Sequence, residues 1–208
     1  MSDAFTYPST ISHTPACQLP HGPTWSDLAE RITRDHHTYG HWETEEQSVA
    51  ALIQLVTQTG MFKMWREVRG TYIQPRIGTI RNEARIDLIL GPTPKLIAAG
   101  WCHGFIGVEC KRTNTKIGPP ISQMLDYGRA VWHLPPSGFR IMLNYVFLWP
   151  MKPLGGPIES IMMQNCLGSL SEYNGTLHFQ TGHAHVADVS PDKASIGQRP
   201  EGRKSGSR

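Results

Sequence analysis

Hydrophobic residues recur every three or four positions between residues 44 and 59, and this spacing predicts an amphipathic helix. Thr44 precedes the pattern as the N-cap, and Gln47, three positions later, completes a capping box. Gly60 follows as the residue that ends the helix. A shorter helix is predicted over residues 25–33.

From residue 62 onward, short runs of β-branched and aromatic residues predict strands. These predicted strands cover residues 62–68, 71–77, 84–91, 95–100 and 105–112. A second amphipathic helix is predicted over residues 121–133, and the most apolar run, residues 139–149, predicts a buried strand. The order of helix, strands, helix and strand predicts an α/β fold with a mixed central β-sheet flanked by helices.

The length of 208 residues suits one domain with loose ends. Residues 25–190 are predicted to form it, with a flexible segment over residues 1–24 and a disordered basic tail over residues 191–208, which lacks the apolar residues needed to order itself. No apolar run approaches the roughly 20 residues of a membrane helix, and no signal peptide is recognisable. A cytoplasmic protein without membrane contact is therefore expected.

The formal charge of +3 conceals a strong segregation along the chain. Residues 1–62 carry two arginines against seven acidic residues, a charge of −5, whereas residues 63–116 carry ten Lys and Arg against four acidic residues, a charge of +6. A basic segment that contains a few acids is typical of a phosphate-binding face around a metal site, and a solvated surface is the alternative.

Within this basic segment, three residues have the chemistry of a metal site. Glu109 and Lys111 are two positions apart on a predicted strand, so their side chains share a face. Asp87 interrupts an otherwise apolar strand, and burying its carboxylate costs several kcal/mol unless a cation or hydrogen bonds compensate. A divalent cation would compensate both Asp87 and Glu109.

Glu46 on the first helix, Asp87, the Glu109-Cys110-Lys111 triplet and the helix that follows resemble the PD-(D/E)xK nuclease superfamily. Gln123 and Tyr127, four positions apart on that helix, resemble the QxxxY motif of its RecB-type and lambda-exonuclease-type members. The resemblance covers about residues 44–149 and implies a restriction-endonuclease-like core. Two departures are Ile86 in place of the motif's proline and the 22 positions from Asp87 to Glu109.

The resemblance implies that Asp87, Glu109 and the backbone carbonyl of Cys110 hold Mg²⁺ or Mn²⁺. Lys111 would position or activate the attacking water, and Glu46 would assist, with Glu45 as the alternative. The residues expected to bind substrate are Gln123, Tyr127, Arg85, Arg112 and Lys116. The implied activity is hydrolysis of phosphodiester bonds in DNA, with RNA as an alternative, by a homo-oligomer or within a larger nucleic-acid-processing complex.

Two other interpretations stay open. The chain is alternatively a nuclease-like fold that no longer cuts and serves as a nucleic-acid-binding or adaptor protein. The second alternative is a structural zinc site built from histidines, with candidate ligands His36, His37, His41, His178, His183 and His185. The four cysteines are scattered without a CxxC pair, which argues against a zinc ribbon and an iron–sulfur cluster.

Overall fold

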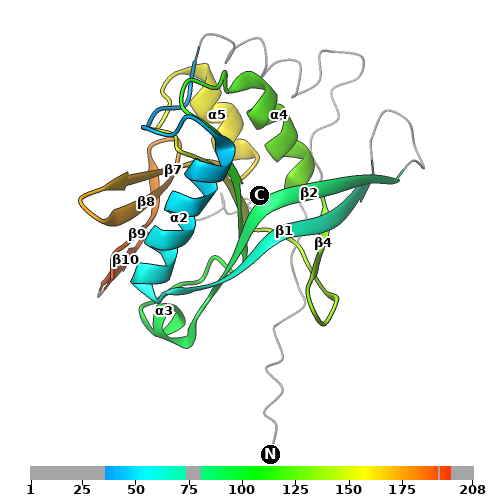
Figure 1. The fold of residues 1–208 in the computed structure, drawn as a ribbon, viewed down its shortest axis with the longest axis vertical. Coiled ribbons are helices and arrows are strands. Elements are labelled where there is room, and N and C mark those ends of the chain that lie inside the picture. The colour runs from blue at the N-terminus through cyan, green and yellow to red at the C-terminus, as the bar shows by residue number, and fades with distance from the viewer. Residues whose placement is uncertain (1–35, 74–80, 192, 198–208) are drawn as a thin grey trace, which may run out of the picture.

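A ten-stranded mixed sheet runs through the computed structural model, which describes residues 36–73, 81–191 and 193–197 (Figure 1). The helices are α2 (Glu45–Thr59), α3 (Pro94–Ala98), α4 (Gly118–Tyr127) and α5 (Pro157–Gln164). The strands are β1 (Phe62–Ile73), β2 (Arg81–Pro92), β3 (Ile106–Cys110), β4 (Val131–Leu134), β5 (Phe139–Ile141), β6 (Tyr145–Trp149), β7 (Leu167–Tyr173), β8 (Thr176–Thr181), β9 (Ala184–Val189) and β10 (Ala194–Ile196).

The strands lie in the order β10-β9-β8-β7-β6-β3-β2-β1-β4-β5. Strand β6 pairs in parallel with β3 on one side and with β7 on the other, and the remaining pairs are antiparallel. Parallel neighbours require a crossover connection, and α4 and α5 lie in the two crossovers. The predicted α/β class with a mixed sheet is therefore confirmed.

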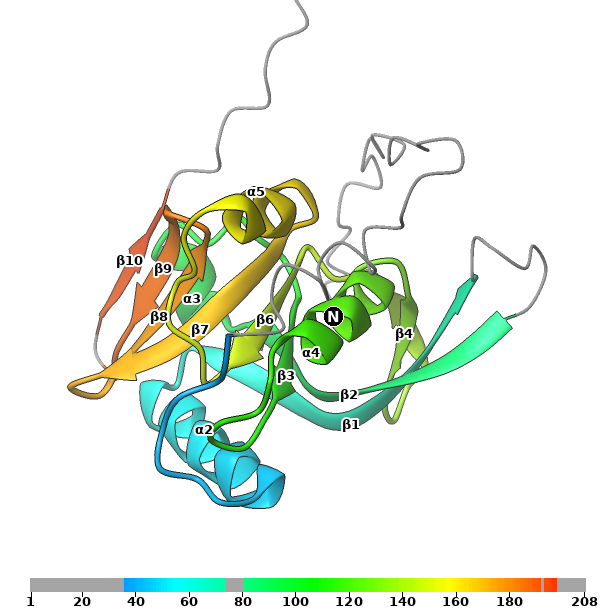
Figure 2. The ribbon, with the colours of Figure 1, turned by 90° about the horizontal axis from the view of Figure 1, so that it is seen from above.

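The sheet separates two apolar cores, with α2 on one face and α4 and α5 on the other (Figure 2). Leu52 of α2 belongs to the core on the first face, together with Leu88 of β2. Met124 of α4 and Ile161 of α5 belong to the core on the opposite face. Because both faces are covered, β3 and β6 are buried along their whole length, as expected for central parallel strands.

The ends of α2 follow the sequence closely. The Thr44 side chain accepts a hydrogen bond from the Gln47 backbone N–H, and the Gln47 side chain accepts one from the Thr44 backbone, which completes the predicted capping box. Gly60 ends the helix with φ +62°, a left-handed conformation that favours glycine. The capping box places Glu45 and Glu46 in the first turn, where carboxylates interact favourably with the helix dipole.

Four predictions differ in the structure. The strands predicted over residues 62–68 and 71–77 are joined in one strand, β1, and residues 74–77 lie outside the described residues. Residues 95–100, predicted as a strand, contain most of α3, because Pro94 at the helix start and the alanines favour a short helix. The helix predicted over residues 121–133 ends at Tyr127, and its last residues enter β4. The single strand predicted over residues 139–149 is two strands, β5 and β6.

The ends of the predicted domain also need correction. Residues 194–196, placed in the disordered tail, form the edge strand β10, which pairs with β9. Ala194 and Ile196 pack against the core under α2, so this short segment has enough apolar contact to be ordered. Residues 1–24, the helix predicted over residues 25–33 and residues 198–208 lie outside the described residues. None of the described helices is long and apolar enough to cross a membrane.

Candidate functional site

In the β1–β2 hairpin, the regular alternation of side chains between the two faces of the sheet is interrupted where Glu67 lies opposite Asp87. The antiparallel pairing continues on both sides of these two residues but skips them. Glu67 has φ +51°, in the left-handed region that non-glycine residues rarely adopt. Leu88 packs in the core under α2, whereas Ile86 packs in the core under α4, so regular alternation breaks at Asp87. This irregularity lets a carboxylate sit between two apolar cores.

Strand β2 also leaves β3 at Asp87. The last pair of the two strands is Leu88 opposite Val108, so the pairing stops one position short of Asp87 and Glu109. The Cys110 backbone N–H donates a hydrogen bond of 2.7 Å to Asp87 Oδ2 in place of a ladder partner. The 22 positions between Asp87 and Glu109 are therefore no obstacle, because the intervening segment holds α3 and returns β3 alongside β2.

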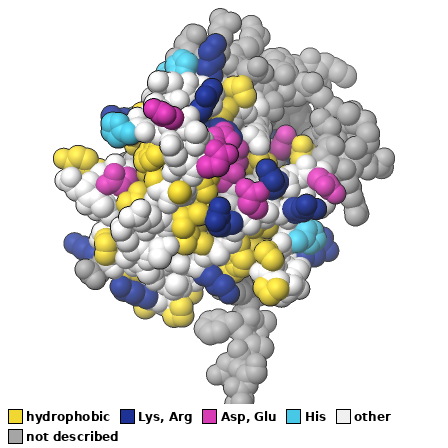
Figure 3. Space-filling view, viewed as in Figure 1, with side chains coloured by type: hydrophobic (Ala, Val, Ile, Leu, Met, Phe, Trp, Pro, Cys, Tyr) yellow, Lys and Arg dark blue, Asp and Glu magenta, His cyan; other side chains and the backbone are white. Residues whose placement is uncertain are grey.

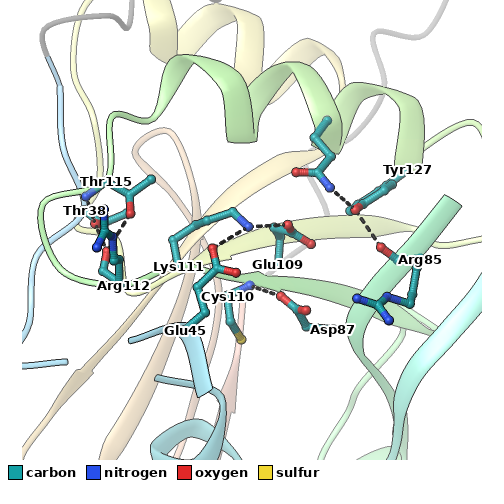
Figure 4. A network of polar contacts seen from close by, with 11 residues as sticks. Thr38, Glu45, Arg85, Asp87, Glu109, Cys110, Lys111, Arg112, Thr115 and Tyr127 are labelled. Atoms are coloured by element: carbon teal, nitrogen blue, oxygen red, sulfur yellow. Dashed lines mark hydrogen bonds and ion pairs between the residues drawn. The ribbon is translucent and has the colours of Figure 1, made fainter. Parts of the chain in front are cut away.

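Lys111 connects Glu109 to the start of α2 (Figure 4). Its Nζ lies 2.7 Å from Glu109 Oε1 and 2.9 Å from Glu45 Oε1. The Glu109 side chain is 3% exposed and the Lys111 side chain 14% exposed, so this ion pair is largely shielded from water. The predicted common face of Glu109 and Lys111 agrees with this contact.

The helix carboxylate at the site is Glu45, so the preference for Glu46 is wrong. Glu45 lies three and seven positions before Ser48 and Leu52, which are both fully buried, so it shares the inward face of α2. Glu46 is exposed, and hydrogen bonds from its own backbone N–H and from Thr44 lower its carboxyl pKa. Glu46 thus interacts with the helix terminus and makes no ion pair with Lys111.

Burial dominates the electrostatics of the two strand carboxylates. It raises the pKa of Glu109 to about 7, and the charge of Asp87 adds to the effect while Lys111 opposes it. Burial also raises the pKa of Asp87, although the Cys110 N–H and Lys111 favour its ionised form. Burial alone would lower the pKa of Lys111, but Glu109 and Glu45 outweigh it and raise that pKa above the ordinary lysine value.

The oxygen atoms at this point fit a hard divalent cation. Glu109 Oε2 is buried without a hydrogen-bond partner, so one carboxylate oxygen is left for a cation. The N–H and C=O of a strand residue point toward the same neighbour, so the Cys110 carbonyl leaves β3 on the side of Asp87. Across the described ranges, no cluster of three or more His, Cys, Asp and Glu side chains is arranged to hold a metal ion. The candidate set is two carboxylates and one carbonyl, the oxygen ligands that Mg²⁺ prefers.

Gln123 and Tyr127 of α4 attach this helix to β2. The Tyr127 hydroxyl donates a hydrogen bond of 2.7 Å to the Arg85 carbonyl, and Gln123 Nε2 donates to the same hydroxyl. Tyr127 is 3% exposed, and burial and the nearby carboxylates of Glu109 and Asp87 raise its pKa. The two residues therefore hold the backbone of β2 two positions before Asp87.

The predicted basic residues lie in different places. The Arg85 guanidinium forms a 2.8 Å ion pair with Glu67 and lies on the side of β2 away from α4 (Figure 4). Arg112 lines a cavity of about 300 Å³ beside the start of α2, and Lys116 is exposed where its backbone pairs with His37. Arg85 lies two positions before Asp87 on β2, and its partner Glu67 was missed because no sequence pattern marks its left-handed conformation.

The C-terminal histidines contact two different carboxylates. His178 Nδ1 lies 2.7 Å and His185 Nε2 3.3 Å from Asp188 Oδ1 on the face of β8 and β9. His183 Nε2 lies 2.9 Å from Glu159 of α5. His183 and His185 therefore contact different carboxylates, and the three histidines do not converge as one set of zinc ligands.

Comparison of the chain with protein-family models, curated proteins and solved structures found no match. The interpretation of the site rests on the geometry of its own residues. Asp87 and Glu109 meet where β2 leaves β3, and Lys111 joins them to the first turn of α2.

Proposed function

We propose that this chain is a metal-dependent nuclease that hydrolyses phosphodiester bonds in DNA. The observation that carries the proposal is the convergence of Asp87, Glu109 and Lys111 at the point where β2 separates from β3. The order α2, β1, β2, β3, α4 and β6, with β6 parallel to β3, supports a restriction-endonuclease-like core. The buried, unpartnered Glu109 Oε2 supports a cation as the missing partner.

Asp87, Glu109 and the Cys110 carbonyl would hold Mg²⁺ or Mn²⁺. Such a cation would neutralise the negative charge that develops on the phosphate and would lower the pKa of the water bound to it. The Cys110 N–H orients the Asp87 carboxylate, so one of its oxygens is already committed to the protein. The ionised forms of both carboxylates are costly without a cation, since burial raises their pKa values.

Lys111 acts in this proposal as a permanent cation and hydrogen-bond donor. Its raised pKa keeps the ammonium protonated, so it orients the nucleophile and stabilises negative charge on the phosphate without removing a proton. Glu45 and Glu109 hold Nζ from two sides and limit the positions that the side chain adopts. Gln123 and Tyr127 are positioning residues, because they hold the strand that carries Asp87.

The test is cleavage of linear, closed-circular and branched DNA by the purified protein with Mg²⁺ or Mn²⁺. Asp87→Ala and Lys111→Ala are expected to abolish cleavage while circular dichroism shows the native fold. Lys193→Ala, an exposed residue beside the edge strand β10, is the matched control and is expected to cut normally. Absence of cleavage on all substrates would refute the proposal, and full activity in either site variant would refute the assigned roles.

A nuclease-like fold that binds nucleic acid without cutting it is the second candidate. Lys111 favours it, since the ammonium already neutralises part of the carboxylate charge without a metal ion. A titration with Mg²⁺ separates the two functions. The adaptor binds DNA in a salt-dependent manner with no turnover at any concentration of divalent cation, whereas the nuclease turns over when Mg²⁺ is added.

A further inference from the structure

Two arginines lie directly opposite each other on the β1–β2 hairpin. Arg69 of β1 pairs in register with Arg85 of β2. Their neighbours Val68 and Ile86 point into the core under α4, so the arginines point to the other side of the hairpin. Both side chains are exposed, Arg85 to 69%. The hairpin therefore presents two guanidinium groups together on one solvent-facing side.

This pairing is unfavourable without an anion. The Cβ atoms of directly opposed residues in an antiparallel pair lie about 4.5–5.5 Å apart, and like charges at that distance repel. Glu67 forms an ion pair with Arg85, whereas Arg69 makes none within the described residues. Glu83 lies diagonally across from Arg69 on the same side but forms no ion pair with it among those residues. Among the described residues, Glu67 thus neutralises Arg85 alone, and the charge of Arg69 is left without a carboxylate partner.

The two arginines lie close to Asp87 along the hairpin. Arg85 is two residues from Asp87 on the same strand, a distance of about 7 Å along β2. Arg66, on the strand segment before Glu67, pairs with Leu88 and so lies on the side of α2 as well. Acidic and basic side chains adjoin one another on the face shown in Figure 3. A phosphate bound between Arg69 and Arg85 would lie two positions along β2 from Asp87.

We propose that Arg69 and Arg85 form a phosphate clamp for the backbone of duplex DNA, and that Glu67 is the counter-ion that holds Arg85 when no DNA is bound. The clamp rests on the proposed function in that it names how the substrate is held. A duplex fits because a two-stranded β-ribbon enters a DNA groove, and each strand of this hairpin is 12 residues long. Guanidinium groups bind phosphate oxygens in a bidentate manner, which fixes position as well as charge.

Binding in EDTA tests the clamp without any cleavage. Fluorescence anisotropy of a labelled duplex is measured against salt concentration for Arg69→Gln, Arg85→Gln, Glu67→Gln and the control Lys193→Gln. Each arginine variant is expected to bind roughly tenfold more weakly. Each is also expected to lower the slope of log affinity against log salt by about 0.9, the value for one phosphate contact. Glu67→Gln is expected to bind the duplex more tightly, because Arg85 then has no ion pair with Glu67 to break before it contacts the phosphate.

The outcomes separate this proposal from the proposed function. Loss of binding in both arginine variants, in a protein that never cuts, supports the clamp and refutes the nuclease. Arginine variants that match Lys193→Gln in affinity and slope refute the clamp, whatever the cleavage result. An effect on a single strand of the same length without one on the duplex refutes the duplex assignment. Weaker binding by Glu67→Gln refutes the counter-ion role. Arg85→Lys keeps the positive charge, so it is expected to keep the wild-type slope of log affinity against log salt.

Discussion

Glu109 makes the stability of the metal-free protein depend on pH. Its folded-state pKa of about 7 lies above the ordinary value of 4.5, so folding favours the protonated carboxyl. The stabilisation that protonation provides is complete below the unfolded-state pKa and is lost as the pH rises through the folded-state pKa. From these two values, the free energy of unfolding falls by roughly 2–3 kcal/mol between pH 5 and pH 8 through this group alone.

The variant Glu109→Gln removes the titration and keeps a side chain of similar shape. In EDTA, the difference in unfolding free energy between wild type and variant is expected to change by roughly 2–3 kcal/mol from pH 5 to pH 8, with the variant relatively more stable at pH 8. The corresponding change in melting temperature is about 5–10 °C for a chain of this size. Urea unfolding followed by tryptophan fluorescence measures both proteins across the range.

Mg²⁺ provides a second measurement of the same effect. A cation bound by the ionised carboxylates stabilises wild type more at pH 8 than at pH 5, and it leaves Glu109→Gln with a smaller response. Because the charge of Asp87 raises the pKa of Glu109, Asp87→Asn is expected to move the midpoint of the wild-type pH dependence downward. Parallel pH profiles of wild type and Glu109→Gln would refute the reasoning.

Three smaller changes test the supporting structure. Thr44→Ala removes the capping bond of α2 and is expected to lower the free energy of unfolding by about 1 kcal/mol in urea; an unchanged midpoint would contradict the cap. Tyr127→Phe leaves the Arg85 carbonyl without its partner and is expected to cost about 1–3 kcal/mol, and a variant as stable as wild type would rule out that bond. Glu45→Gln is expected to slow cleavage whereas Glu46→Gln does not, and the reverse result would restore Glu46.

The sequence marked three residues that lie together in the structure, whereas it located several strands of the sheet poorly. Asp87, Glu109 and Lys111 were recognised because a charged residue in an apolar strand is costly and needs a partner, which is a local signal. The start of β4 was missed because this strand depends on pairing with β1, about sixty residues away in the chain, and β5 pairs in turn with β4. Short apolar runs such as residues 95–100 suit helix and strand equally, and tertiary context decides between them.

The choice between Glu45 and Glu46 shows the same limit within one turn of helix. The hydrophobic pattern gave weight to Val49 and Ile53, which are only partly buried against the core. The inward face instead includes the polar residue Ser48, whose carbonyl accepts a hydrogen bond from the Trp149 indole N–H. A buried serine carries no hydrophobic signal, so periodicity alone rotates the predicted face by about one residue.

The unfavourable features of the β1–β2 hairpin fall within a few positions of one another. Glu67 adopts a left-handed conformation, which costs about 1–3 kcal/mol in a residue other than glycine. Asp87 is a carboxylate placed between two cores, and Arg69 opposes Arg85 two register positions away. Regular, neutral strands would be more stable at every one of these positions. In the proposed function, a divalent cation at Asp87 and a phosphate at the two arginines would each compensate a different part of this cost.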